Sequence, residues 1–172
     1  MLISKKINDA INQQVGNEFG AANQYVAIAT HFDIEALPQL AAHFYQQATE
    51  ERDHAMKFVK YLVEAGGQPV IPAIPAPQAK FTSAERAVKL SLDWEIEVTK
   101  QINKLVELAK KECDYTTDNF LQWFIKEQLE EVSSMDALHK VIARAGEGNL
   151  LRVEEWLVRK SGTAAKPQAD AT

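Results

Sequence analysis

Four long segments of the chain repeat apolar residues at alternating steps of three and four, and polar residues interrupt each apolar stripe near its middle. This spacing places the apolar side chains on one face of an α-helix. The segments are residues 5–33, 38–65, 83–111 and 115–145. Packing between such helices would favour Leu or Phe at the interrupted positions. The chain instead has Glu18, Glu51, His54, Glu95, Gln128 and Glu131 there.

The interruptions repeat along the chain. Glu18 and Glu95 are 77 residues apart, and so are the pair Glu51 and Gln128 and the pair His54 and Glu131. The same offset joins Glu50 to Glu127. A chance distribution of polar residues would not keep this spacing, so the two halves of the chain are predicted to be two similar helix pairs.

The positions also agree in depth. If one helix ends near Ile34 and the next begins near Pro38, then Glu18 and Glu51 lie about 20–24 Å from their common turn, at 1.5 Å per residue. The second pair has the same placement around a turn near Asp114 to Thr116, since Glu95 precedes Lys111 by as many residues as Glu18 precedes Ile34, and Gln128 follows Tyr115 by as many as Glu51 follows Pro38. We therefore expect side chains from all four helices to meet at mid-height of the bundle.

The segment from Gly66 to Phe81 contains four prolines and excludes both helix and central strand. At about 3.1 Å per residue it reaches about 50 Å, which exceeds a helix of about 42 Å. It can therefore run the whole length of the bundle. The expected fold is all-α, an antiparallel four-helix bundle with a long crossover between the second and third helices. Thr82 and Glu85 have the spacing of a capping box at the start of the third helix.

Residues 150–160 form a predicted short fifth helix after Gly146 and Gly148. The bundle domain is accordingly expected over residues 1–160, followed by a flexible tail over residues 161–172. His31, His43 and His139 are interpreted as surface or ordinary packing residues, and Cys113 as a thiol without chemistry.

The charge, hydropathy and cysteine content of the chain exclude several classes of function. The formal charge of −5 argues against a nucleic-acid partner, which would call for a basic face, and suits a protein that attracts cations. No apolar run reaches the length of a membrane span, and the N-terminal residues lack a signal-peptide core. We expect no membrane association and a cytoplasmic location. The single cysteine excludes an internal disulfide and a Cys-x-x-Cys metal site.

The buried carboxylates require a positive partner, because burying several charges without one costs several kcal/mol for each. No Lys or Arg stands on the four stripes. Carboxylate oxygens with one imidazole suit iron or manganese better than a structural zinc ion. Four carboxylates balance two divalent cations. A purely structural bundle, in which the glutamates are protonated or solvated, is the alternative that the residues alone leave open.

At this point the sequence resembles the ferritin family, in particular the non-haem bacterial ferritins, over residues 5 to about 160. The resemblance is carried by Glu18 followed by Tyr25, the run E-E-R-D-H at 50–54, Glu95, and the run E-Q-L-E-E at 127–131. Di-iron bundles use Glu-x-x-His on two helices and Glu on two others. Here Gln128 and Glu131 replace the second Glu-x-x-His. Arg52 stands where bacterioferritins have a haem-ligating Met, so no haem is expected.

The resemblance implies a ferroxidase centre with two irons per subunit and assigns roles to its residues. Glu18, Glu51 and His54 would bind the first iron, and Glu51, Glu95 and Glu131 the second, with Gln128 a weak partner. Three further glutamates match a third iron site: Glu50, Glu127 and Glu130. Tyr25 matches a tyrosine that supplies an electron during oxygen reduction, although a core tyrosine with a satisfied hydroxyl is an equal alternative. Trp123 could act likewise.

The expected activity is oxidation of Fe(II) by O2 or H2O2, with Fe(III) stored as a mineral inside a homo-oligomeric cage. The cage of twenty-four subunits follows from the resemblance alone. A di-iron peroxidase or oxidase without mineral storage is the alternative with the same ligands.

Overall fold

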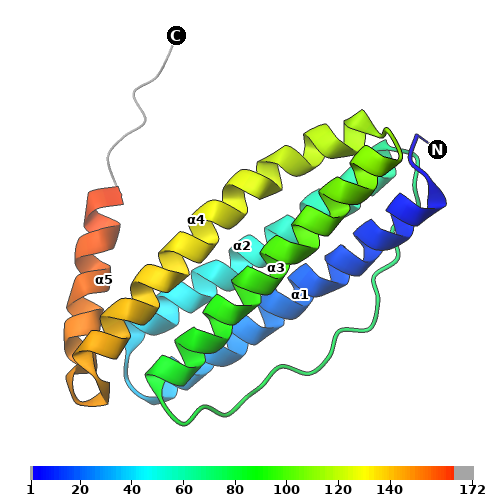
Figure 1. Ribbon diagram of the computed structural model, residues 1–172. Helices are drawn as coiled ribbons and strands as arrows, with labels where there is room; N and C mark the ends of the chain where they lie inside the picture. Colours follow the sequence, from blue (N-terminus) through cyan, green and yellow to red (C-terminus); the bar gives the residue numbers. More distant parts are fainter. Residues whose placement is uncertain (1, 165–172) are drawn as a thin grey trace.

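A computed structural model describes residues 2–164, and the regular secondary structure in this part of the chain is all helical, without strands (Figure 1). Four long helices lie side by side and a shorter one packs across one end of them. Their bounds are α1 Lys5–Ile34, α2 Pro38–Glu64, α3 Ala84–Lys111, α4 Tyr115–Ala145 and α5 Leu150–Ala164, with a single 3-10 turn, η1, over Glu147–Asn149. The predicted four-helix bundle with a short fifth helix is confirmed.

Local sequence explains where the helices begin. The hydroxyls of Ser4 and Ser83 accept from the backbone N–H groups three residues later, each at 3.1 Å, and the Asp114 carboxylate does so at 2.9 Å. Pro38 occupies the first position of α2, where its missing N–H costs nothing.

Two predicted details at helix ends are wrong. Ser83, not Thr82, caps α3, and the Glu85 carboxylate faces His139 at 3.8 Å instead of reaching back to the cap. Both Ser and Thr cap helices, and Ser is the better of the two, so the capping-box spacing of Thr82 was misleading. Helix α5 continues four residues beyond Lys160, because a glycine at position 162 weakens a helix without ending it. The remainder of the predicted tail, residues 165–172, lies outside the described residues.

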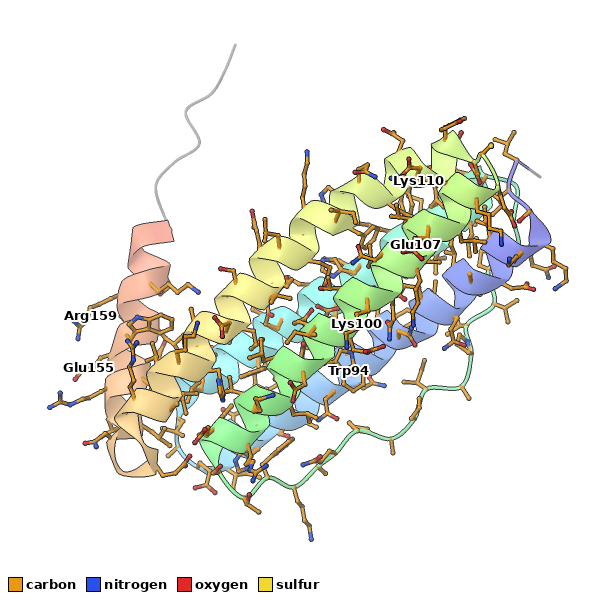
Figure 2. All side chains as sticks on the ribbon, viewed as in Figure 1. Trp94, Lys100, Glu107, Lys110, Glu155 and Arg159 are labelled. Atoms are coloured by element: carbon orange, nitrogen blue, oxygen red, sulfur yellow. The ribbon has the colours of Figure 1, made fainter. Side chains whose placement is uncertain are left out.

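Every residue of the four predicted stripes is buried. The apolar ones form two cores, one around Phe32 and Phe44 and the other around Phe58 and Phe124. On each long helix the interrupting polar residues stand between the members of one core and those of the other. The bundle therefore has an apolar half at each end and a polar layer between them. Charged residues such as Lys100, Glu107 and Lys110 lie on the exposed side of α3 (Figure 2).

The crossover between α2 and α3 runs along the outside of the bundle from one end to the other, as predicted (Figure 1). Amide side chains of α1 bind its backbone. Asn8 and Asn12 accept from the N–H groups of Gln68 and Val70 at 2.8 and 2.7 Å. Further along, Gln24 both accepts from and donates to the backbone of Gln78. These side-chain bonds satisfy backbone N–H and C=O groups of the crossover, which lacks the backbone partners that a helix or a sheet would supply.

The C-terminal part of the chain completes the N-termini of two long helices. The Glu154 carboxylate, on α5, accepts from the N–H groups of Gln39 and Leu40, both at 2.8 Å. The Glu147 carboxylate, in η1, accepts from the N–H groups of Ala84 and Glu85, both at 3.2 Å. Carboxylates at these positions satisfy free N–H groups and complement the positive end of the helix dipole.

None of the helices within residues 2–164 is both long enough and apolar enough to traverse a lipid bilayer.

The contact between α1 and the crossover yields a stability prediction. A Cβ added at Gly16 would lie well inside van der Waals contact with the Pro72 ring. We expect Gly16→Ala to lower the free energy of unfolding by about 1–3 kcal/mol, the usual cost of overpacking, despite alanine's better helix propensity. Thermal or denaturant unfolding measures this change.

Gly148→Ala is the matched control, because a Cβ there meets nothing within 4 Å. Equal unfolding curves for the two variants would contradict the proposed close approach.

Candidate metal centre

The polar layer brings together all six residues that interrupt the stripes. Each is buried, with exposed fractions between 0 and 6%. They come from all four long helices: Glu18 from α1, Glu51 and His54 from α2, Glu95 from α3, and Gln128 and Glu131 from α4. The helix ends at Ile34, Pro38, Lys111 and Tyr115 agree with the positions used to predict this common depth.

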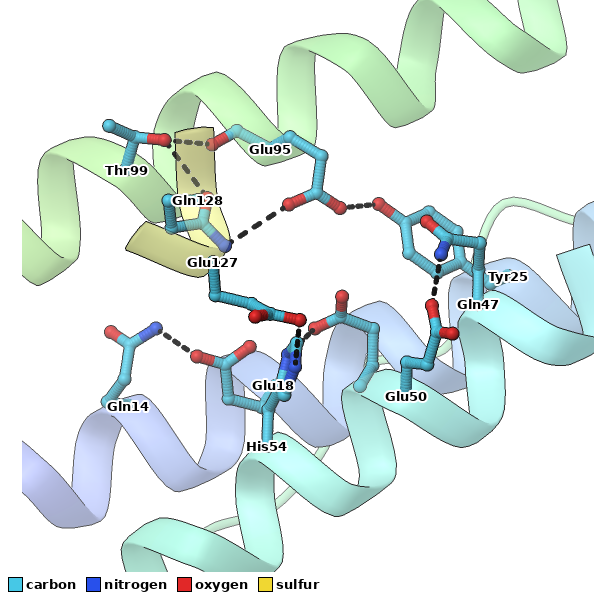
Figure 3. Close-up of polar contacts among 11 residues, drawn as sticks. Gln14, Glu18, Tyr25, Gln47, Glu50, His54, Glu95, Thr99, Glu127 and Gln128 are labelled. Carbon is cyan, nitrogen blue, oxygen red and sulfur yellow. Dashed lines mark hydrogen bonds and ion pairs between the residues drawn. The ribbon is translucent and has the colours of Figure 1, made fainter. Parts of the chain in front are cut away.

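Glu18, Glu51 and His54 form the first group that could hold a cation. One ligand atom from each lies within 4.8 Å of the others, and all three residues are buried. His54 Nδ1 is 3.5 Å from Glu51 Oε2. Gln14, one turn before Glu18 on α1, donates to Glu18 Oε1 at 2.8 Å and so orients that carboxylate (Figure 3). The predicted neighbourhood of these three side chains is present.

Three carboxylate oxygens in this group have no hydrogen-bonding partner among the described residues. They are Glu18 Oε2 and both oxygens of Glu51, and all are buried. A buried polar atom without a partner costs free energy, so native proteins rarely retain one without a reason. Several such oxygens aimed at one point beside an imidazole are the arrangement that a bound metal ion would satisfy.

A second group of possible ligands consists of His54, Glu127 and Glu131. His54 Nε2 lies 3.7 Å from Glu127 Oε1 (Figure 3). The two nitrogens of His54 thus face different carboxylates, Glu51 on its own helix and Glu127 on α4. The sequence assigned Glu127 to a separate third set and did not place it against His54.

Glu95 belongs to neither group and is held by a hydrogen-bond network (Figure 3). Its carboxylate accepts from the Tyr25 hydroxyl and, at 3.5 Å, from the Gln128 amide. The Thr99 hydroxyl lies 3.0 Å from Gln128 Oε1 and 2.9 Å from the Glu95 carbonyl oxygen. Tyr25 is fully buried in contact with this carboxylate, a position that fits both roles considered for it, the electron donor and the packed core tyrosine.

Burial raises the pKa of every carboxyl in the layer. Desolvation, followed by the neighbouring carboxylate, holds the pKa values of Glu18 and Glu51 well above their usual range. Burial raises the pKa of Glu95 to about 7. Burial and the charge of Glu95 raise that of Glu131 to about 8. Without a cation, the layer therefore retains protons near neutral pH.

An acidic cavity of about 680 Å³ lies beside the layer, between α2, α4 and α5. Four of its lining residues are glutamates: Glu50, Glu127, Glu130 and Glu131. Gln47 donates to the Glu50 carboxylate, and Glu130 is exposed. The three residues of the predicted third site thus line one cavity, which also reaches Glu131 in the buried layer.

Sequence reasoning missed the side chains that orient these carboxylates. Gln14 and Thr99 each stand one helical turn from a stripe glutamate, Glu18 and Glu95, and that spacing is the available signal. His43 was assigned to ordinary packing, but it lines the acidic cavity, and burial lowers its pKa to about 4.

The other two histidines lie outside the layer. His31 packs against the rings of Phe32 and Phe81, and His139 lies near Glu85. Trp123 is 40% exposed, touches the edge of the His54 ring at a centroid distance of 5.4 Å, and is covered by the Lys57 ammonium group.

Comparisons with known proteins agree with this architecture. Residues 8–145 match the family described as ferritin-like domain. The chain is 44% identical to Ferritin BfrB of Mycolicibacterium smegmatis over 97% of this chain and 92% of that protein. It is 37% identical to the bacterial non-heme ferritin of Staphylococcus aureus over 85% of this chain and 88% of that protein.

Among solved structures, an open pore ferritin from the archaeon Archaeoglobus fulgidus superposes with a TM-score of 0.87 at 34% identity. The match covers 90% of this chain and 96% of that one. The chain belongs to the ferritin family, and its recognition as a non-haem bacterial ferritin is confirmed.

The raised pKa values predict how the stability of the metal-free protein depends on pH. Glu95 and Glu131 have pKa values of about 7 and 8 in the folded state against 4.5 ordinarily, so the folded state binds more protons between these limits. The protonated carboxyls therefore contribute their full share to the free energy of unfolding below pH 4.5. This contribution is lost as the pH rises through about 7 for Glu95 and about 8 for Glu131. The slope is up to about 1.4 kcal/mol per pH unit for each carboxyl.

Calorimetry of chelator-treated protein from pH 5 to 8 should therefore show a falling unfolding temperature, and Glu131→Gln should flatten the fall. Glu107→Gln, on the exposed face of α3, is the control. An unchanged slope in Glu131→Gln would contradict the raised pKa.

Proposed function

We propose that this protein is a cytoplasmic iron-storage ferritin that oxidises Fe(II) at the buried carboxylate layer and stores Fe(III) as a mineral. The observation that carries the proposal is the set of unpartnered buried oxygens of Glu18 and Glu51 beside His54. An imidazole and several carboxylates form a donor set suited to iron. Membership of the ferritin family supplies the link from metal binding to storage.

The ligand assignment follows the two groups of side chains. Glu18, Glu51 and His54 would bind the first iron. Glu51 would bridge to the second, which Glu95 and Glu131 complete, with Gln128 as a weak partner. In this assignment Glu95 would give up some of its hydrogen bonds from Tyr25 and Gln128 in order to bind the metal ion. The haem ligand of bacterioferritins is replaced by the exposed Arg52, so haem has no role in the proposal.

Iron is here the substrate and the cargo. With O2 as oxidant, two Fe(II) ions give up one electron each, and O2 takes up both electrons and two protons to form H2O2. Carboxylate oxygens stabilise Fe(III) relative to Fe(II) and so favour this direction. The protons held by the layer in the absence of cations leave when Fe(II) binds, because a carboxylate must be deprotonated to act as a ligand.

Glu50, Glu127 and Glu130 would form a further iron site in the acidic cavity. Its position next to Glu131 supports a role in passing iron into or out of the buried layer. Tyr25 is proposed as an electron donor to the oxygen reaction through its hydrogen bond to Glu95. The relative from Archaeoglobus fulgidus is described as an open pore ferritin, which supports a hollow assembly, and we propose a cage of twenty-four copies of this chain.

The first test removes the proposed site. Glu51→Ala with His54→Ala should lower the initial rate of Fe(II) oxidation in air by about 10–100-fold or more, because even groups that only orient metal ligands have effects of this size. The rate is followed by the absorbance of Fe(III). Glu64→Ala, an exposed glutamate on the same helix, is the control. An unchanged rate in the double variant would remove the site and favour a purely structural bundle.

The second test concerns storage. Size-exclusion chromatography of protein loaded aerobically with Fe(II) should show iron and protein together in a particle far larger than one chain. A small species without mineral would argue against storage and favour a di-iron peroxidase or oxidase with the same ligands.

A further inference from the structure

A groove of about 350 Å³ lies between α3 and α4, next to the polar layer but separate from the acidic cavity. Thr99, Ile102 and Asn103 line it from α3. The residues from α4 follow one another at helical spacing: Ile125, Gln128, Leu129 and Val132. Four of these seven side chains are aliphatic. Leu129 lies at the mouth and is 74% exposed, so the groove opens to the surface.

The polar side chains of the groove direct their hydrogen bonds toward the metal layer. Thr99 and Gln128 bond to each other, and the Gln128 amide then donates to the Glu95 carboxylate. Gln128 is 3% exposed, so it forms the inner wall of the groove and at the same time touches a proposed iron ligand. Gln128 thus lies between the groove and Glu95, and the groove offers few free polar groups to water.

The acidic cavity differs from this groove in the ligand that it favours. Its glutamates attract cations, whereas the groove lacks charged side chains altogether. Glu131 lines the cavity and Gln128, one helical turn earlier on α4, lines the groove. Two different kinds of surface therefore reach the same layer from two sides of α4.

We propose that the groove between α3 and α4 binds small apolar gases and is the route by which O2 reaches the carboxylate layer, while Fe(II) arrives through the acidic cavity. Enclosed apolar cavities bind apolar guests such as xenon, and the aliphatic wall of this open groove offers the same kind of surface. O2 is uncharged and apolar, so it gains little from the glutamates and is favoured against Ile102, Ile125 and Val132. The O2 part of the proposal rests on the proposed ferroxidase function, whereas the gas site itself does not.

Xenon is a direct probe of the groove. Crystals of the assembled protein under xenon pressure should show anomalous density against Ile102 and Ile125. Absence of xenon there would overturn the proposal, including the case in which a side chain of a neighbouring subunit fills the groove. This result does not depend on iron oxidation, so it separates failure of the gas site from failure of the proposed function.

Kinetics test the route. Leu129→Trp covers the mouth of the groove from an exposed position and should raise the apparent KM for O2 by about threefold or more, with little change in kcat at saturating O2. The oxidation rate with H2O2, a polar oxidant that the acidic cavity can admit, should stay unchanged. The affinity for Co(II), measured without oxygen as a test of cation binding alone, should also stay unchanged.

Leu151→Trp is the matched control, since Leu151 on α5 is 72% exposed and does not line the groove. An unchanged KM for O2 in Leu129→Trp would overturn the route. Equal losses with O2 and H2O2 would also overturn it, because they would indicate a disturbed metal layer instead of a blocked path.

Discussion

The cost of burying carboxylates governs the middle of this bundle. Glu18, Glu51, Glu95 and Glu131 lie where a bundle would otherwise have a continuous apolar core, and they divide that core in two. Apolar cores pack the helices on either side, and the carboxyl groups between them are buried away from water. Instead the carboxyl groups keep protons near neutral pH. Some of their oxygens accept hydrogen bonds from Gln14, Tyr25 and Gln128, and several others have no hydrogen-bonding partner. The layer therefore costs stability, which a bound cation would restore.

The two helix pairs contribute differently to the layer. The α1–α2 pair supplies a compact group of two carboxylates and an imidazole. The α3–α4 pair supplies Glu131, which lies near His54, and also Glu95 and Gln128, which hydrogen bonds join to Tyr25 and Thr99. Residues that are 77 positions apart therefore occupy equivalent places in the two helix pairs but make different contacts. In the proposed assignment the ligands of the first iron already lie together, whereas Glu95 would have to exchange hydrogen bonds to bind the second.

Sequence periodicity was sufficient to predict the four long helices and the common depth of six polar residues, because burial of one face determines both. It could not predict how those residues are oriented. The contacts of Gln14 and Thr99, and of His54 with Glu127, depend on side-chain rotamers set by tertiary packing. The roles of Glu147 and Glu154 were equally hidden, because each binds a helix end more than 60 residues away along the chain. Local rules identify a cap only when it is adjacent to the helix that it caps.

These distant caps have a consequence for synthesis on the ribosome. The carboxylate oxygens that complete the N-terminus of α2 come from the side chain of Glu154, 114 residues after Leu40. Helix α2 therefore emerges and can pair with α1 long before its first N–H groups find their partner. In the same way, α3 is synthesised before Glu147, whose carboxylate completes its N-terminus. The nascent bundle must therefore pass through a state in which two helix ends are open to solvent, and translation of the last segment closes both.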